Sequence, residues 1–203
     1  KQMVSDKTMY NKYLPDNYKY YVFIEYVGGD IENDYDTFEK TIMESLEKGL
    51  VDDAVLGKDE KEQLNIWGIR EDVAVLAEEK KFDQHFDISI PVALIGEVID
   101  KTIIELRNCQ GVETIFPFGH VADGNIHFII GKDSNDDDLK SKINEIIYSN
   151  TELVKGSISA EHGIGLDKKK YLIKSRSKDE IELMRLIKKS IDPKNILNPG
   201  RVF

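Results

Sequence analysis

The chain has 203 residues, of which 40% are hydrophobic and 33% charged, as in an ordinary globular protein with a buried core. Its formal net charge of −10 argues against binding to a phosphate backbone, so we expect no nucleic-acid partner. No apolar run approaches the roughly 20 residues that cross a bilayer. The single cysteine, Cys109, excludes an internal disulfide and indicates a reducing compartment, with core filling as its expected role.

The first part of the chain predicts a strand and two helices. Residues 18–29, YKYYVFIEYVGG, are rich in aromatic and β-branched side chains and end on a glycine pair, which is typical of a buried strand. From Asp36 onward, apolar residues recur every four positions, which predicts a helix. Residues 51–57 are a candidate short strand, and residues 58–79 predict a long amphipathic helix despite Gly68.

The middle of the chain predicts a strand, a helix and a pair of strands. Residues 86–90, FDISI, suit a strand, and Pro91 suits the first turn of a helix with one apolar side. Two further strands, 112–120 and 125–131, flank the pair Asp123-Gly124.

The last part predicts two helices separated by a glycine-rich segment. One helix follows the acidic run at 134–138, and residues 156–165, GSISAEHGIG, suit a short strand that leads into a loop. Ser177 and Glu180 form a capping box that opens the final helix, which should stop at Asp192-Pro193.

Strands and helices alternate along the chain, yet the clearest strand pair is a hairpin. This favours an α+β fold with a mainly antiparallel sheet, helices packed on one face and ferredoxin-like elements, over a parallel doubly wound fold. Because no low-complexity linker interrupts the chain, one compact domain over residues 1–203 is the simplest expectation.

The hairpin motif GHVADGNIH, residues 119–127, contains two of the four histidines of the chain. Asp-Gly favours a two-residue type I′ turn, which would place His120 directly opposite His127, with Cβ atoms about 4.5–5.5 Å apart. Two imidazoles so placed can hold one metal ion. Alternatively, each histidine is a half-buried aromatic residue with one hydrogen bond, and a longer loop would break the pairing.

Glu161, in SISAEHGIG, is the best third ligand for such an ion. A catalytic metal site commonly uses two histidines and a carboxylate with one open position, whereas a structural zinc site needs four closed ligands. The adjacent His162 cannot easily point the same way from extended backbone, so it could accept a proton in the same pocket. Gly163 and Gly165 leave the backbone free to bend. The alternative is a loop carboxylate in a surface ion pair.

Three motifs, GHVADGNIH, SISAEHGIGLDKKKYL and LIKKSIDPKNILNPGRVF, resemble the C-terminal domain of the FAD-linked oxidases. The branch contains the D-lactate, glycolate and D-2-hydroxyglutarate dehydrogenases, among the vanillyl-alcohol oxidase-like flavoproteins. YYVFIEYVGG and LNIWGIRED extend the resemblance over nearly the whole chain. It implies a cap and substrate domain over residues 1–203, with FAD held mainly by an N-terminal domain absent from this chain. The fragment alone should be inactive.

The resemblance also implies residue roles. It implies that His120, His127 and Glu161 bind a divalent metal (Zn, Fe or Mn), that His162 is the catalytic base, and that Arg70, in WGIRED, grips the substrate carboxylate.

Two asparagines are implied to lie near the flavin. Asn125 follows the Asp-Gly pair and Asn198 lies in ILNPG. Alternatively, Asn125 stabilises the hairpin turn and Asn198 belongs to a Pro-Gly turn after the last helix.

The implied reaction is the oxidation of a 2-hydroxy acid to the 2-oxo acid, with hydride passing to FAD. This chain departs from the 2-hydroxyglutarate enzymes at three pocket positions, where Ala74 replaces a threonine, His85 a lysine and Ile129 an asparagine. The loss of these polar contacts favours a smaller or more apolar acid, such as lactate, glycolate or a longer aliphatic 2-hydroxy acid. Alternatively, a protonated His85 still pairs with a distal carboxylate, or His85 is simply a surface strand residue.

The implied partners are the 2-hydroxy acid, the protein's own FAD-binding domain and an unidentified electron acceptor, with a homodimer left open. We expect a cytoplasmic location, or peripheral attachment to the inner membrane through an electron-transfer partner. Two other functions compete: a metal-dependent hydrolase using the same His-His-Glu site, and a non-catalytic ferredoxin-like ligand-binding module.

Overall fold

The computed structural model describes residues 8, 10–76 and 81–203. The chain divides into two compact units, Lys1–Glu78 and Glu79–Phe203, although the sequence predicts one compact domain. Among the described residues of the first unit, only Gly68 and Leu76 are buried, whereas the second unit contains a continuous apolar core. The candidate ligands His120, His127 and Glu161 all belong to the second unit, so the packing of that unit positions them.

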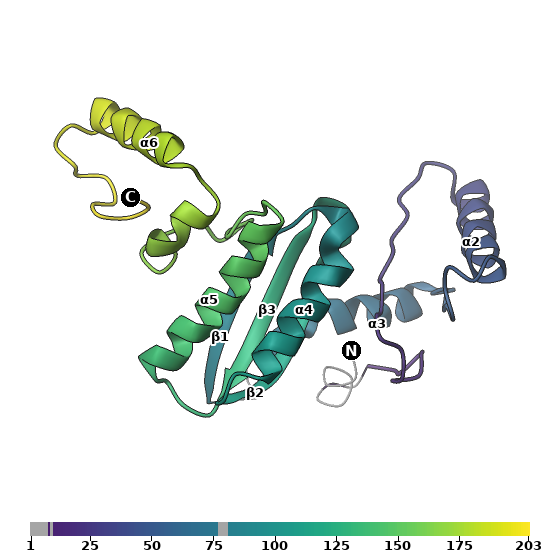
Figure 1. The fold of residues 1–203 in the computed structure, drawn as a ribbon. Coiled ribbons are helices and arrows are strands. Elements are labelled where there is room, and N and C mark those ends of the chain that lie inside the picture. The colour runs from purple at the N-terminus through teal and green to yellow at the C-terminus, as the bar shows by residue number, and fades with distance from the viewer. Residues whose placement is uncertain (1–7, 9, 77–80) are drawn as a thin grey trace. The chain divides into compact units, whose positions relative to one another are not determined.

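The described residues of the first unit form two α-helices, labelled in Figure 1. Helix α2 (Ile31–Glu47) is capped by Asp30, and α3 (Glu60–Glu71) is capped by Asp59. The predicted long helix is shorter than expected, because after Glu71 the chain tightens into the 3₁₀ helix η1 (Asp72–Leu76). This segment includes β-branched valines, which lose side-chain freedom in a helix. Residues 77–79 of the prediction lie outside the described residues.

The two strands predicted in the first unit are wrong. Residues 18–29 and 51–57 are irregular in the structure. A strand needs a partner for its backbone N–H and C=O groups, and residues 18–29 pair with no strand in the described part of the chain. Their apolar side chains are exposed, with Val22 at 66% and Val27 at 83%.

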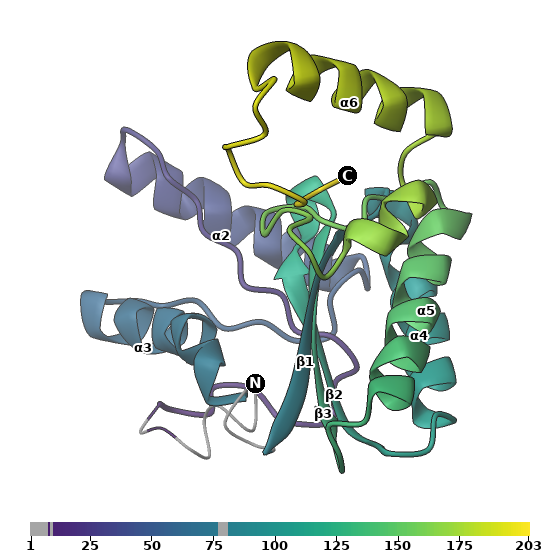
Figure 2. The same cartoon turned by 90° about the vertical axis from the view of Figure 1, so that its left-hand side faces the viewer.

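The second unit is built on a three-stranded antiparallel sheet. Strands β1 (Phe82–Ser89), β2 (Val112–His120) and β3 (Asn125–Lys132) lie in the order β1-β3-β2. Helix α4 (Ile95–Arg107) connects β1 to β2 through the short 3₁₀ helix η2 (Val92–Leu94), and α5 (Asp137–Leu153) follows β3. Figure 2 shows both helices on one face of the sheet, which confirms the predicted α+β class.

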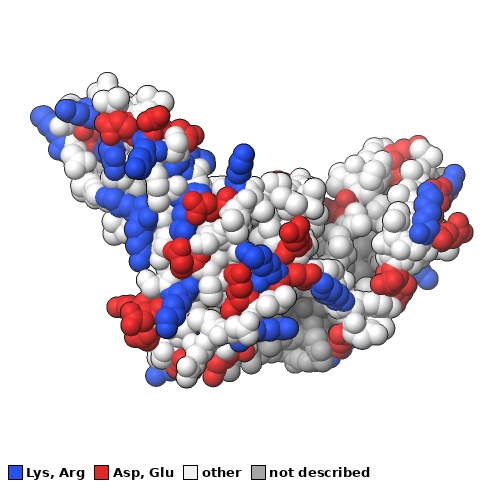
Figure 3. Space-filling model, in the orientation of Figure 1, with Lys and Arg blue, Asp and Glu red and all other residues white. Residues whose placement is uncertain are grey.

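The alternation of side chains along the strands separates a core face from a second face. Phe86 and Ile88 of β1 and the even-numbered residues of β3 point toward α4 and α5 and are almost fully buried. Cys109 packs against this core, as its expected filling role requires. The outer face of the two helices carries charges of both signs (Figure 3). On α4, Lys101 and Glu105 form an ion pair at 3.5 Å. The odd-numbered residues of β3 are left on the face opposite the helices.

The chain order β-α-β-β-α is that of a ferredoxin-like unit whose last strand is reduced to one bridge. Ser157 pairs with Ser89 through two backbone hydrogen bonds of 2.7 and 2.9 Å. The short strand predicted in residues 156–165 is thus only this bridge. It nevertheless anchors the following loop beside the end of β1.

The two-residue type I′ turn predicted between β2 and β3 is wrong. The connection has four residues, a 3₁₀ turn η3 (Val121–Asp123) and Gly124 in the left-handed conformation, with φ 74°. Gly124 alone takes a positive φ here, while the Asp123 side chain accepts the backbone N–H of Asn125 at 2.9 Å. The Gly124 carbonyl also accepts the N–H of Ile90 at 3.0 Å. These contacts favour the longer loop.

The C-terminal part begins with the 3₁₀ helix η4 (Lys169–Lys174) and continues into α6 (Lys178–Ile191). The predicted capping box between Ser177 and Glu180 is present. After α6, the carboxylate of Asp192 accepts the backbone N–H groups of Ile196 and Leu197, both at 2.9 Å. Within the described residues, every helix is too short or too polar to span a membrane.

Candidate metal centre

Three predicted ligands from separate segments meet on the face of the sheet opposite the helices. His120 ends β2, His127 lies within β3, and Glu161 lies in the loop after the Ser157 bridge. Each offers a ligand atom, and these atoms lie within 4.8 Å of one another. Two imidazoles and one carboxylate suit a divalent ion of the zinc, iron or manganese type.

The two histidines meet by a different register from the one expected. His120 lies directly opposite Asn125, while His127 lies opposite Phe118 on β2 and Asp87 on β1. Because Asn125 and His127 are two residues apart on one strand, His120 shares their face and reaches His127 diagonally. The two imidazole ring centroids are 6.2 Å apart and nearly perpendicular, at 81°. The longer loop breaks the mirror pairing but keeps the rings adjacent.

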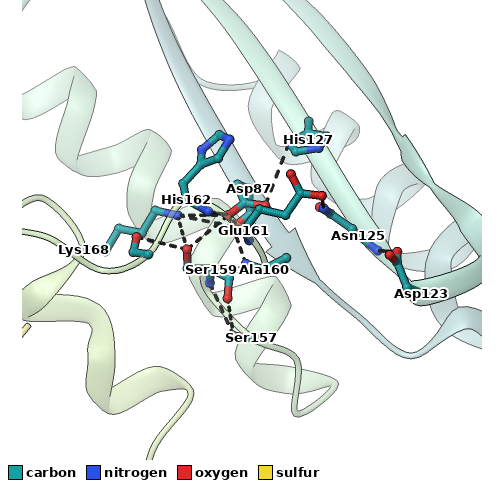
Figure 4. Close-up of polar contacts among 11 residues, drawn as sticks. Asp87, Asp123, Asn125, His127, Ser157, Ser159, Ala160, Glu161, His162 and Lys168 are labelled. Atoms are coloured by element: carbon teal, nitrogen blue, oxygen red, sulfur yellow. Dashed lines mark hydrogen bonds and ion pairs between the residues drawn. The ribbon is translucent and has the colours of Figure 1, made fainter. Parts of the chain in front are cut away.

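Asn125 holds the carboxylate of Glu161. Its side-chain amide donates to Oε1 of Glu161 at 2.6 Å, as Figure 4 shows. Asn125 is 2% exposed, and its Oδ1 is buried without a hydrogen-bond partner among the described residues. The contact joins the hairpin to the 157–165 loop, so Asn125 orients a candidate ligand.

The loop that carries Glu161 and His162 is bound to β1 through Asp87. Oδ2 of Asp87 accepts the backbone N–H groups of Ala160 at 3.0 Å and of Glu161 and His162 at 2.8 Å each (Figure 4). The hydroxyl of Ser159 donates to the same oxygen at 3.1 Å. One carboxylate oxygen therefore gathers four donors from four consecutive residues.

His162 belongs to a second group of candidate ligands that shares His127 with the first. Its ring centroid is 5.7 Å from that of His127, with 29° between the planes. His162, His127 and Asp87 form a second group whose ligand atoms lie within 4.8 Å of one another. Gly163 and Gly165 follow with φ of 77° and 56°, a left-handed bend that glycine adopts without strain. Glu161 and His162 therefore both lie near the imidazole of His127, each in a different group of candidate ligands.

The protein environment sets the charge of these groups. Burial lowers the pKa of His127, against the attraction of Asp87 and Glu161, which favours the neutral imidazole that binds metals. Burial raises the pKa of Asp87, but the hydrogen bonds from His162 and Glu161 outweigh it and lower the net value. The ammonium of Lys168, 3.7 Å from Oδ2, acts in the same direction.

The remaining predicted residues belong to neither group of candidate ligands. Arg70 is in the last turn of α3, in the first unit, and Ala74 is in η1. Asn198 lies in the loop after α6 with φ 44°, and no described hydrogen bond joins it to the candidate ligands. His85 and Ile129 are directly opposed on β1 and β3, one same-face pair along from Asp87 and His127.

Sequence reasoning missed Asp87 and Lys168, which are both buried. The signal for Asp87 was a single carboxylate inside the apolar strand FDISI, since a buried charge needs partners. Lys168 carried no comparable signal, because it belongs to a run of three lysines.

The fold and the clustered side chains define an α+β module with a candidate metal centre. The family model described as FAD linked oxidases, C-terminal domain, matches residues 2–202. The chain therefore belongs to the family of FAD-linked oxidases, through their C-terminal domain.

Named relatives share this domain. The chain is 36% identical over 185 residues to a mitochondrial D-2-hydroxyglutarate dehydrogenase of Arabidopsis thaliana, covering 91% of this chain and 32% of that protein. It is 33% identical to a D-2-hydroxyglutarate dehydrogenase of Xanthomonas citri, with coverages of 91% and 40%. A Schizosaccharomyces pombe protein, provisionally named a mitochondrial D-lactate dehydrogenase, is 30% identical, with coverages of 96% and 40%.

This chain spans about a third to two fifths of the length of these relatives, by the coverages of 32% to 40%. Two of these three relatives are named as mitochondrial proteins. Their names therefore differ from the cytoplasmic location that we expect from the sequence of this chain.

Proposed function

We propose that the chain is the C-terminal cap and substrate domain of a flavin-dependent dehydrogenase that oxidises a 2-hydroxy acid to the 2-oxo acid. The observation that carries the proposal is the meeting of His120, His127 and Glu161, whose ligand atoms lie within 4.8 Å of one another. Membership in the family of FAD-linked oxidases supports FAD as the cofactor. In this proposal the FAD is held mainly by an N-terminal domain outside these residues.

In this proposal the two histidines and Glu161 hold a divalent cation, zinc, iron or manganese. When bound, the ion would supply a Lewis acid that lowers the pKa of the substrate hydroxyl, and the flavin would supply the hydride acceptor. His162 accepts the hydroxyl proton at a ring nitrogen, a role typically worth ~10²–10⁴-fold in rate. Arg70 binds the substrate carboxylate through a bidentate pair.

The two asparagines have subordinate roles. Asn125 keeps Glu161 oriented through its 2.6 Å hydrogen bond and contributes to the pocket beside the flavin. Asn198, in the loop after α6, is the second proposed flavin neighbour.

The substrate we propose is a small 2-hydroxy monocarboxylate of the lactate or glycolate type. His85 and Ile129 lie next to the candidate centre on its own face of the sheet, where the dicarboxylate enzymes carry lysine and asparagine. His85 is already paired with Asp83, at 2.7 Å between Nε2 and Oδ2. An apolar residue and an engaged imidazole bind a distal carboxylate poorly.

Metal analysis combined with flavin reduction in the full-length protein tests the proposal. We expect one divalent ion per chain, and flavin reduction on addition of lactate or glycolate that exceeds the reduction by 2-hydroxyglutarate. His127→Ala should lose both the ion and flavin reduction. His85→Ala, which removes the histidine outside both clusters, should keep the ion.

Two outcomes would support the competing functions. Ester or amide cleavage that depends on added Zn²⁺ and needs no flavin would favour the hydrolase. A protein purified without chelators that holds no stoichiometric metal would favour the non-catalytic binding module.

A further inference from the structure

Asp87 is a buried carboxylate to which the proposed reaction assigns no role. It is 0% exposed and lies in the middle of β1, directly opposite His127. A buried charge is retained only where hydrogen bonds and a counter-charge compensate its lost hydration. Oδ2 has this compensation in four donors and the Lys168 ammonium.

The donors to Oδ2 determine the backbone of the loop. The N–H groups of Ala160, Glu161 and His162 converge on one oxygen, a concave arrangement that fits a single anionic acceptor. None of these three amides donates to a backbone carbonyl in the described chain. Asp87 therefore fixes the directions in which the side chains of Glu161 and His162 project from the loop.

The other oxygen of Asp87 faces His127. Oδ1 is buried, accepts no hydrogen bond from the described residues, and lies 4.0 Å from Nδ1 of His127. A carboxylate beside one ring nitrogen of a histidine favours the tautomer protonated there and leaves the other nitrogen for a metal.

Lys168 completes the arrangement from the far side. Its ammonium donates to the Ser159 hydroxyl at 2.9 Å and to the Asp87 backbone carbonyl at 3.4 Å. The same ammonium lies 3.7 Å from Oδ2, so this oxygen is engaged by protein groups on every contact that the described residues make with it. Because two of these contacts are with the backbone of Glu161 and His162, Asp87 is placed to orient those two residues.

We propose that Asp87 is the positioning residue of this site, with Oδ2 shaping the loop that presents Glu161 and His162 and Oδ1 orienting His127. The inference rests on the proposed function for the identity of the ion. The capture of the three loop amides by Oδ2 does not depend on that function.

Hydrogen exchange, resolved by residue and measured on the full-length protein without added metal, tests the loop directly. Ala160, Glu161 and His162 belong to no helix or strand, and in the described chain their amides donate to Asp87 and to no backbone carbonyl. Their protection from exchange should therefore depend on Asp87. We expect slow exchange in the wild type and exchange at least about 10-fold faster in Asp87→Asn. Exchange at the free rate in the wild type would overturn the proposal, even if the variant failed to fold.

Titration with Zn²⁺ alone tests the second half. We expect Asp87→Asn to weaken binding by about 10–100-fold, as removal of an outer-shell partner does, with melting still cooperative. Asp137→Asn makes the same change of charge on a side chain that is 96% exposed, and should leave binding and exchange unchanged.

Two results separate this inference from the proposed function. A wild type that binds no Zn²⁺ refutes the metal centre, while slow exchange of the three amides still supports the positioning of the loop. Loss of Zn²⁺ in Asp87→Asn as complete as in His127→Ala, with the loop amides still protected, would make Asp87 a ligand and overturn the positioning role.

Discussion

The side-chain amide of Asn125 donates to Oε1 of Glu161 at 2.6 Å, across 36 positions of the sequence. This hydrogen bond connects the end of the hairpin to a loop that is otherwise held by β1. Because Asn125 is buried and Glu161 is exposed, the amide restrains the carboxylate from the protein side and leaves its other oxygen available.

Asn125→Ala should therefore weaken metal binding without unfolding the protein. We expect Zn²⁺ affinity to fall by about 10–100-fold, because the carboxylate ligand loses its orienting partner. Titration calorimetry on the full-length protein measures this change. Asn135→Ala, in the exposed loop before α5, is the matched control. Equal affinities in Asn125→Ala and wild type would show that Glu161 needs no such restraint.

Gly124→Ala should destabilise the hairpin loop. Gly124 has φ 74°, and a Cβ atom there would lie 2.0 Å from the Ile90 carbonyl oxygen. We expect the free energy of unfolding to fall by more than about 1 kcal/mol, since alanine is strained at positive φ. Gly96→Ala, at a site in α4 with nothing within 4 Å, should be neutral or slightly stabilising. Urea denaturation of the two variants gives the comparison, and equal effects would contradict the prediction.

Truncation of the core should separate buried from exposed isoleucines. Ile143 of α5 is 0% exposed, whereas Ile104 of α4 is 60% exposed. Ile143→Ala should cost ~2–5 kcal/mol of unfolding free energy, from lost burial and the cavity left behind. Ile104→Ala should stay within about 0.5 kcal/mol. Urea midpoints and slopes measure both, and a small cost at Ile143 would contradict the packing of α5 on the sheet.

Asp192 should make the C-terminal segment sensitive to acid. The hydrogen bond from Lys188, followed by that from the Ile196 N–H, lowers the pKa of Asp192 to about 2 from an ordinary value of 3.8. A lowered pKa in the folded state stabilises the protein above the unfolded value, and this contribution is lost as pH falls through the folded value.

Melting temperatures measured from pH 7 to pH 2 test this sign. The advantage of wild type over Asp192→Asn should be constant above about pH 4 and should shrink between about pH 4 and pH 2. Asp167→Asn, in an exposed loop position, should not reproduce this curve. An advantage that persists unchanged to pH 2 would mean that Asp192 is not ionised in the way its contacts imply.

Substrate preference should respond to the opposed pair His85 and Ile129. The double variant His85→Lys with Ile129→Asn adds a charge and an amide beside the candidate centre, on the same face of the sheet. We expect kcat/KM for 2-hydroxyglutarate relative to lactate to rise by at least about 10-fold. Ile129→Val, which stays apolar, is the control, and steady-state rates with a dye acceptor measure the ratio. No change in the ratio would place substrate selection elsewhere.

The accuracy of the sequence-based predictions differs between the two units for a physical reason. Helices α4, α5 and α6 were predictable because their apolar spacing and capping residues are local signals. Residues 18–29 have strand composition but no strand partner in the described chain, and pairing is a property of two segments. Composition alone could not supply the partner.

Local sequence signals were sufficient to predict the α+β class, the hairpin around Asp123-Gly124 and the chemical types of the candidate ligands. These depend on periodicity, turn residues and side-chain chemistry, which act over a few positions. Two features could not be read from local signals: His120 lies opposite Asn125, and Asp87 accepts three backbone amides from a loop more than 70 residues away. Register and long-range hydrogen bonds follow from the packing of the whole unit, because each needs two distant segments to be placed before either contact can form.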